Sequence, residues 1–302
     1  MLKHASLFAG IGGFDLGIKA AGVTDTIQTG LFIENNPDAQ RVLKYRFPHI
    51  PIHSDIRDYC PKPGEFTLHT IGFPCTGTSA AGNGAGLEHP ESKLWFYALR
   101  AIAIGKPDFI IVEQPRGIIT NGLRAILGGL RVVGYQWDNP QIISCSELGG
   151  VHKRERLFVI AYTHNISRRF RELPTGWGEQ IRTEVEATHS QRRQTTSSSA
   201  RVDDGVPSWM GGTSVSGHWR NALSTAPTYP GVHHHLNRRR SCVDLYGRAV
   251  TPQQAAIAIK RVCYLAELAG ISGNCDNSDN LDNQGNHLTS ASRFFGGDSQ
   301  VF

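Results

Sequence analysis

The first half of the chain alternates short apolar runs with segments of helical periodicity. The apolar runs, each ending at glycine, proline or a polar residue, cover residues 4–10, 29–35, 68–74 and 108–115. Between them, residues 38–47 and 92–105 repeat apolar side chains at the spacing of one helix face. Residues 136–150 and 154–163 indicate two more strands and the loop between them. Strands that alternate with helices predict an α/β fold with a mostly parallel sheet.

The pattern changes near Asn165, where a polar, loop-rich and arginine-rich stretch begins. It carries tryptophans at positions 177, 209 and 219, and it predicts a second, smaller module or a long insertion. Helical periodicity returns over residues 251–270, so we expect the chain to re-enter the first domain. The predicted organisation is a first domain at 1–164, a small irregular domain at 165–238, a return to the first domain at 239–268, and a disordered tail at 269–302.

Composition limits the class of protein. The chain has 302 residues, of which 39% are hydrophobic and 19% are charged, and this length can bury a full core. No run approaches the roughly 18 apolar residues of a membrane span, and the N-terminal segment lacks a secretory pattern, so we expect a cytoplasmic protein. The six cysteines include no CxxC pair, which favours reduced thiols over a zinc site or a disulfide framework.

Positive charge gathers in the second half of the chain. The net charge is +5, but residues 153–261 contain seventeen Lys and Arg against eight Asp and Glu. This excess favours an anionic partner, and a solvated basic surface is the alternative explanation. Three histidines at 233–235 could suggest a metal, but adjacent side chains project in different directions. We therefore expect no metal site.

The first apolar run leads into a turn with glycines at positions 10, 12, 13 and 17. Such a turn before a helix lets a nucleotide-like ligand approach the backbone, although it can also exist without a ligand. Asp15 stands where the dinucleotide pattern GxGxxG needs its third glycine, which disfavours NAD. Glu34, at the end of the second run, can accept hydrogen bonds from two ribose hydroxyls. Asp55 lies between the helical segment at 38–47 and the next apolar run, and it can accept a hydrogen bond from an exocyclic amine. The two acids would together hold an adenosine, and a solvated loop acid is the alternative for each.

Cys75 lies between Pro74 and a run of small residues that continues to Gly86. The proline fixes the backbone that enters the cysteine, and the small residues would let the following loop close over a substrate. As a thiolate, Cys75 would be a strong nucleophile, whereas a buried structural cysteine is the alternative. Glu113 ends the fourth run, where a carboxylic acid could protonate a ring nitrogen as the thiolate adds nearby.

Two arginines begin the last predicted strand of the first domain. Arg154 and Arg156 alternate, so both would face the same way on an extended backbone. Two guanidiniums on one face suit a phosphate or a carbonyl oxygen. A charged strand edge without a ligand is the alternative.

Seven motifs follow one another along residues 4–265. In chain order they are FAGIGG, Glu34, Asp55, GFPC, Glu113, RER and LYGRAVTPQQAAIAI. This order resembles the C5-cytosine DNA methyltransferases, particularly their short phage and prophage forms. The resemblance implies a Rossmann-like sheet domain that binds S-adenosyl-L-methionine and a small target-recognition domain. Double-stranded DNA would lie between them, with the target cytosine flipped out of the stack.

The resemblance also assigns roles to residues at matching positions. Cys75 would be the nucleophile that attacks C6 of the cytosine, and Glu113 would contact N3 and the exocyclic amine. Arg156 would contact the cytosine carbonyl, and Arg154 would brace the active-site loop or a phosphate. The implied cofactor site consists of Phe8, Gly10, Ile11, Gly12, Glu34, Asp55, Ile56, Pro74 and Val250. We expect a monomeric enzyme, and the sequence does not reveal whether a restriction endonuclease accompanies it.

Three motifs depart from the family's pattern. Glu-Asn-Val is EQP at 113–115, Gln-x-Arg-x-Arg is HKRER at 152–156, and Gly-Asn-Ala-Val is GRAV at 247–250. In addition, Thr76 stands where the family often has glutamine. The thiol of Cys75 and the acid of Glu113 match the family's pattern.

Three other functions compete with DNA methylation. A non-catalytic DNA-binding relic of a methyltransferase is disfavoured because Cys75 and Glu113 are both present. An RNA cytosine-C5 methyltransferase of the same fold is disfavoured because the Cys-Phe-Thr of that branch is absent. A nicotinamide dehydrogenase is disfavoured by Asp15.

Overall fold

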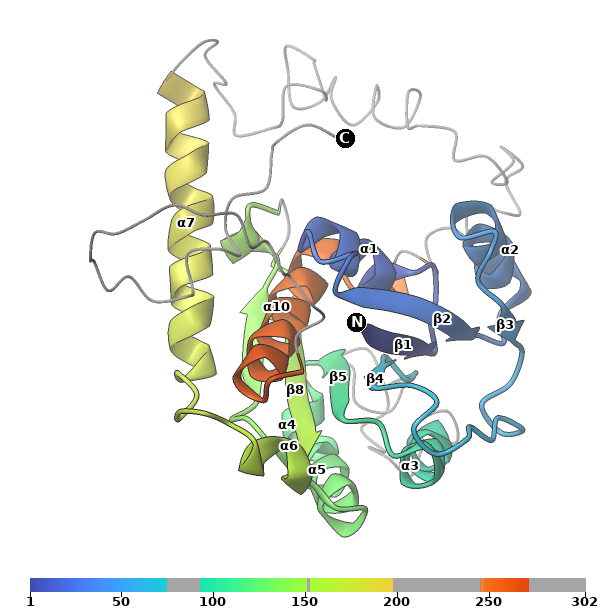
Figure 1. The fold of residues 1–302 in the computed structure, drawn as a ribbon. Helices are drawn as coiled ribbons and strands as arrows, with labels where there is room; N and C mark the ends of the chain where they lie inside the picture. The colour runs from blue at the N-terminus through green and yellow to red at the C-terminus, as the bar shows by residue number, and fades with distance from the viewer. Residues whose placement is uncertain (75–92, 151–152, 198–244, 246, 272–302) are drawn as a thin grey trace, which may run out of the picture.

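An eight-stranded mixed sheet forms the centre of the described part of the chain (Figure 1). The computed structural model describes residues 1–74, 93–150, 153–197, 245 and 247–271. The strands are β1 (Leu2–Leu7), β2 (Ile27–Ile33), β3 (Ile52–His53), β4 (Leu68–Ile71), β5 (Phe109–Pro115), β6 (Tyr135–Trp137), β7 (Gln141–Ser144) and β8 (Glu155–Thr163). Their order is β3-β2-β1-β4-β5-β8-β6, and β7 also pairs with β8.

The first five strands are parallel, and β8 pairs antiparallel with β5, β6 and β7. This arrangement confirms the predicted mostly parallel α/β sheet. The direction in which strands are added reverses between β1 and β4. β2 and β3 lie on one side of β1 in the sheet, and β4 and β5 lie on its other side. In open α/β sheets, ligands bind at the carboxyl ends of the strands beside such a switch point.

Helices cover both faces of the sheet (Figure 1). They are α1 (Gly13–Ala20), α2 (Pro37–Arg46), α3 (Leu94–Gly105), α4 (Ile118–Asn121), α5 (Leu123–Val132), α6 (His164–Arg168), α7 (Trp177–Ser197) and α10 (Pro252–Leu268). Phe109 and Ile111 of β5 belong to one hydrophobic cluster, with α1 and α10, whereas Ile110 and Val112 belong to another, with α3 and α5. Since side chains alternate along a strand, the clusters lie on opposite faces. Burial on both faces explains the continuous apolar run of this strand.

Helices α1 and α2 begin at residues whose type favours the start of a helix. Asn36 caps α2 by accepting hydrogen bonds from the N–H groups of Asp38 and Ala39, and Pro37 occupies the first turn. Gly12 precedes α1 with a φ of 85°, a left-handed conformation that favours glycine. These starts place both helices directly after the ends of β2 and β1.

The segment after Asn165 differs from the loop-rich stretch that its composition predicts. Helices α6 and α7 occupy its first part, and Trp177 and Ile181 of α7 join the hydrophobic cluster that contains α10. An ion pair of 3.0 Å between Glu184 and Lys260 adds a polar contact between the two helices. The start of the predicted second domain therefore packs on the first domain. Residues 198–238 lie outside the described part, so the domain assignment stays a prediction.

The last described residues continue the packing of α10. Ala269, where the predicted tail begins, is buried, and Ile271 packs against the same cluster. Residues 272–302 lie outside the described part of the chain. In the described residues, no helix combines the length and apolar character needed to cross a membrane.

Candidate functional site

The predicted site residues follow the carboxyl ends of five neighbouring strands. Phe8 follows β1, Glu34 follows β2, Asp55 follows β3 and Pro74 follows β4, while Glu113 lies near the end of β5. Parallel strands end at the same edge of a sheet, so the topology brings these residues together on either side of the switch point. Cys75 itself lies outside the described residues, because the first described segment, 1–74, ends at Pro74.

The turn from β1 to α1 is held in an unusual backbone conformation. Phe8, Gly10 and Gly12 have φ angles of 58°, 56° and 85°. A positive φ is uncommon for a residue with a side chain, and such strain is concentrated at functional sites. The following Gly13 allows close packing, because a Cβ there would come within 2.6 Å of the carbonyl oxygen of Val250. Val250 therefore contacts the start of α1, next to the predicted cofactor turn.

Glu34 joins this turn to the end of β2. Its carboxylate accepts hydrogen bonds from the N–H of Gly10 at 2.7 Å and from the N–H of Asn36 at 2.8 Å. Burial raises the pKa of Glu34, and the backbone donors of Asn36 and Gly10 act in the opposite direction. The carboxylate is thus fixed beside the turn, with one oxygen bound to Gly10 of the turn and the other to Asn36, the cap of α2.

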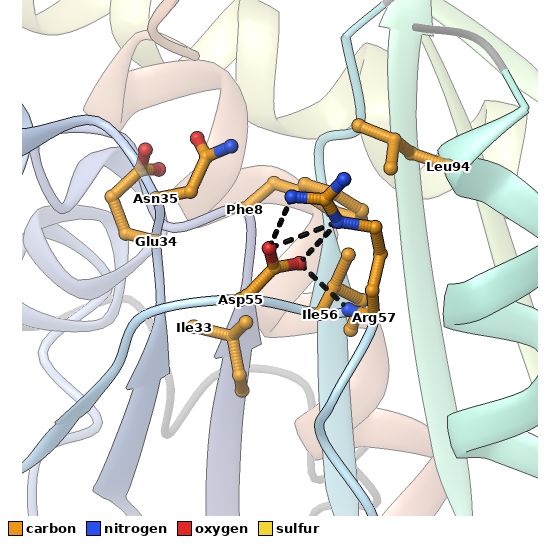
Figure 2. A pocket seen from close by; sticks show the side chains of 8 residues that line it. All are labelled: Phe8, Ile33, Glu34, Asn35, Asp55, Ile56, Arg57 and Leu94. Carbon is orange, nitrogen blue, oxygen red and sulfur yellow. Dashed lines mark hydrogen bonds and ion pairs between the residues drawn. The ribbon is translucent and has the colours of Figure 1, made fainter. Parts of the chain in front are cut away.

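A cavity of about 240 Å³ opens beside Glu34 (Figure 2). It is lined by Phe8, Ile33, Glu34, Asn35, Asp55, Ile56, Arg57 and Leu94. Four of the predicted cofactor residues, Phe8, Glu34, Asp55 and Ile56, are among them. The other five, Gly10, Ile11, Gly12, Pro74 and Val250, are outside this lining. Gly10 and Val250 instead contact Glu34 and α1, as described above, and Arg46 donates to the carbonyl oxygen of Ile11 at 3.0 Å.

Asp55 carries an ion pair within this cavity (Figure 2). Arg57 donates through its backbone N–H and its Nε to Oδ1 at 2.8 and 3.0 Å, and through Nε and a terminal nitrogen to Oδ2 at 2.9 and 2.5 Å. The hydrogen bond from the guanidinium lowers the pKa of Asp55. Asp55 is therefore an ionised hydrogen-bond acceptor on the cavity wall.

Glu113 forms a second acidic group, on the other side of the switch point. Its carboxylate is buried and lies 2.7 Å from Nε of Arg156. Its Oε2 lies 3.4 Å from the place that a Cβ of Gly72 would occupy. Burial raises the pKa of Glu113, while Arg156 and Arg154 act in the opposite direction. The acid thus lies next to the Gly72–Pro74 segment that leads into Cys75.

Gln114 fixes the backbone of that same segment. Its Nε2 donates to the carbonyl oxygen of Phe73 at 2.9 Å, and the side chain is buried. Gln114 replaces the asparagine of the family's pattern, so this departure supplies a contact between the ends of β5 and β4.

The structure differs from the prediction that Arg154 and Arg156 alternate on one extended strand, although both guanidiniums act on the carboxyl group of Glu113. β8 begins at Glu155, and Arg154 precedes it with a φ of 29°. The alternation of an extended strand therefore does not apply to Arg154. Its guanidinium donates to the carbonyl oxygens of Gly247 and Ala249, at 2.8 and 2.5 Å. Arg154 braces the segment before α10, whereas Arg156 pairs with Glu113.

Several residues at the site have no role in the sequence-based prediction, among them Ile33 and Asn35 of the cavity wall. Arg57 pairs with Asp55, Leu94 begins α3 and lines the cavity, and Gln254 donates to the carbonyl oxygens of Ile143 and Arg154 at 2.7 and 2.8 Å. The spacing of Arg57, two residues after an acid, was an available signal for an ion pair. The contacts of Leu94 and Gln254 join distant segments and leave no local sequence pattern.

Comparison with known proteins identifies a family. Residues 2–248 match the family model of the C-5 cytosine-specific DNA methylases. The type II methyltransferase M.CviJI of Paramecium bursaria Chlorella virus IL3A is 32% identical over 166 residues, which are 53% of this chain and 42% of that protein. The type II methyltransferase M.Bsp6I of Bacillus sp. (strain RFL6) is 31% identical over 169 residues, 54% of this chain and 52% of that protein.

Solved structures give a weaker match. The Dnmt2 methyltransferase of S. pombe is 20% identical, covers 59% of this chain and 58% of its own, and has a TM-score of 0.45. The chain spans about half the length of the curated relatives that it matches. The family model, in contrast, extends over most of the chain, from β1 to the segment that Arg154 braces. The chain therefore belongs to the C-5 cytosine-specific DNA methylase family.

Proposed function

We propose that this protein transfers a methyl group from S-adenosyl-L-methionine to C5 of a cytosine in a specific double-stranded DNA sequence. The observation that carries the proposal is the position of Glu113. It is a buried carboxyl group, paired with Arg156, beside the Gly72–Pro74 segment that leads directly into Cys75. Family membership supports the same reaction.

The residues beside the switch point fit an adenosine-containing cofactor. Glu34 presents a carboxylate that suits the ribose hydroxyls, and Asp55 presents one that suits the exocyclic amine. Among the described residues, no atom beyond the chain neighbours lies within 4 Å of the place that a Cβ of Gly10 would occupy, so the turn leaves space for a ligand. When bound, S-adenosyl-L-methionine supplies an electrophilic methyl group on a sulfonium.

The groups on the other side of the switch point suit activation of the base. The thiolate of Cys75 would form a bond to C6 of the cytosine while the protonated carboxyl of Glu113 donates at N3. Addition raises the electron density at C5, the carbon that accepts the methyl group. Loss of the C5 proton would then return an electron pair to the ring and release the thiolate. Arg156 would hold the cytosine carbonyl and keep Glu113 oriented.

This chemistry requires the cytosine to leave the base stack, because C6 and N3 are inaccessible inside a duplex. We propose that the arginine-rich segment at 165–238 contacts the DNA and selects the target, and that the enzyme works as a monomer in the cytoplasm of a prokaryotic host cell. Positive charge in that segment suits the phosphate backbone.

Radiolabelled methyl transfer tests the proposal. The protein is incubated with S-adenosyl-L-methionine carrying a tritiated methyl group and with unmethylated genomic DNA, which is then digested to nucleosides. We expect the label on 5-methyldeoxycytidine for the natural chain and no label for Cys75→Ala. Label confined to methyladenine, or to RNA supplied in parallel, would contradict the proposal.

A further inference from the structure

We propose that Arg57 competes with the ligand's exocyclic amine for Asp55, and so sets the affinity and base preference of the cofactor cavity. The inference rests on the proposed function, since it concerns an adenosine ligand in that cavity. It adds a specificity-determining residue that neither the motifs nor the family match assigns.

The hydrogen bonds on Asp55 leave little room for another donor. A carboxylate offers about four lone-pair sites. Two donors of Arg57, the backbone N–H and Nε, converge on Oδ1, while Nε and a terminal nitrogen converge on Oδ2. Three donors of Arg57 thus make four contacts with the carboxylate, and an incoming amine would compete with the guanidinium for the same two oxygens.

Arg57 also belongs to the cavity wall. Figure 2 shows the guanidinium directed at the carboxylate of Asp55, and Asp55, Arg57 and Leu94 all line the cavity. The backbone N–H of Arg57 can keep its bond to Oδ1 when the side chain leaves, because that bond belongs to the turn. Withdrawal of the guanidinium would thus free the carboxylate without moving it.

The competition is weak enough to be overcome by a ligand. The side chain of Arg57 is 58% exposed and that of Asp55 is 20% exposed, so solvent screens the ion pair. Exposed pairs of this kind change equilibria by factors of about two to five. Removal of the guanidinium should therefore tighten binding of an amine-bearing ligand by about two- to fivefold.

Calorimetric titration of the full-length protein tests this inference. The two probes are S-adenosyl-L-homocysteine, which carries the amine, and S-inosyl-L-homocysteine, which carries a carbonyl oxygen in its place. Arg57→Ala is compared with the natural chain and with Arg41→Ala. Arg41 forms an exposed ion pair with Asp38 on α2, is not among the residues that line the cavity, and serves as the matched control.

We expect Arg57→Ala to bind S-adenosyl-L-homocysteine about two- to fivefold more tightly, with no gain for S-inosyl-L-homocysteine and no change for Arg41→Ala. Arg57→Lys should give a smaller gain, because an ammonium cannot form the two-pronged contact. Unchanged or weaker binding by Arg57→Ala, or an equal gain for both probes, would overturn the competition. Failure of the natural chain to bind S-adenosyl-L-homocysteine would overturn the proposed cofactor itself, and the inference with it.

Discussion

Glu113 experiences two opposing effects on its proton. Its side chain is buried, which disfavours the charged form, and Arg156 lies 2.7 Å away, which favours it. Burial is the larger effect, so the pKa of Glu113 lies above its usual value of 4.5. A raised pKa keeps the carboxyl protonated to higher pH, which is the form that could donate to a ring nitrogen. The protonated fraction falls as pH rises through this pKa.

Substitution of Arg156 should change the pKa of Glu113. In Arg156→Met the guanidinium that favours ionisation is gone, so the pKa of Glu113 should rise further. Carbon-13 NMR of labelled glutamate carboxyls, with Glu113→Gln used to assign the signal, measures the pKa without any need for activity. Arg116→Met is the control, because Arg116 forms its ion pair with the partly exposed Glu155. A Glu113 signal that titrated at or below 4.5 in the natural chain would contradict the account.

At the level of elements, α1 and α10 approach each other through Gly17. A Cβ at this position would come within 2.5 Å of the Cβ of Ala255, so Gly17→Ala should force the helices apart. Overpacking of this kind costs about 1–3 kcal/mol. Gly128→Ala is the matched control within α5, because a Cβ there would meet no atom of another described segment within 4 Å, and it should stabilise the fold by about 0.5–1 kcal/mol. Urea unfolding measures both, and equal effects of the two substitutions would show that the helices do not pack as described.

The start of α10 depends on a buried side chain. Gln254 donates to the carbonyl oxygens of Ile143 and Arg154, which tie the helix to β7 and to the start of β8. Gln254→Ala removes both hydrogen bonds, at about 0.5–1.5 kcal/mol each. The neighbouring Gln253 is exposed, so Gln253→Ala should change the unfolding free energy by less than about 0.5 kcal/mol. Thermal unfolding measures both variants. Equal changes in their unfolding temperatures would argue against a stabilising role for the Gln254 hydrogen bonds.

Most of the strands and two of the acids at their ends were predictable from sequence for a physical reason. Glu34 and Glu113 each lie near the end of an apolar run, and the carboxyl ends of parallel strands meet at one edge. In contrast, β3 has two residues and carries too short a pattern to be recognised. The positive φ of Arg154 and the pairing of Arg57 with Asp55 depend on local backbone geometry, which periodicity does not report. Of the predicted catalytic residues, Cys75 lies outside the described part and its role stays a prediction.

For the whole molecule, the packing of α7 narrows the region that should select the DNA target. Trp177 and Ile181 belong to the same hydrophobic cluster as α10, so these residues support the fold of the sheet domain. We predict that exchange of residues 198–238 for those of a relative changes the methylated sequence, with α7 kept intact. Exchange of all of 165–238 should in addition lower the unfolding temperature. Bisulfite sequencing of host DNA reads the target, and an unchanged target after the shorter exchange would place recognition elsewhere.

The central claim is that Cys75 and Glu113 act together on a cytosine, and covalent trapping tests it most directly. DNA amplified from mixed genomic sequence with 5-fluorocytosine in place of cytosine is incubated with the protein and S-adenosyl-L-methionine, then separated under denaturing conditions. Fluorine at C5 cannot leave as the proton does, so the sulfur–C6 bond persists once the methyl group has been transferred. We predict a protein–DNA adduct for the natural chain and slower adduct formation for Glu113→Gln. Cys75→Ser should form no adduct. Cys60→Ser, which removes an exposed thiol, should form the adduct as the natural chain does. An adduct formed by Cys75→Ser, or one mapped by peptide sequencing to another cysteine, would contradict the account.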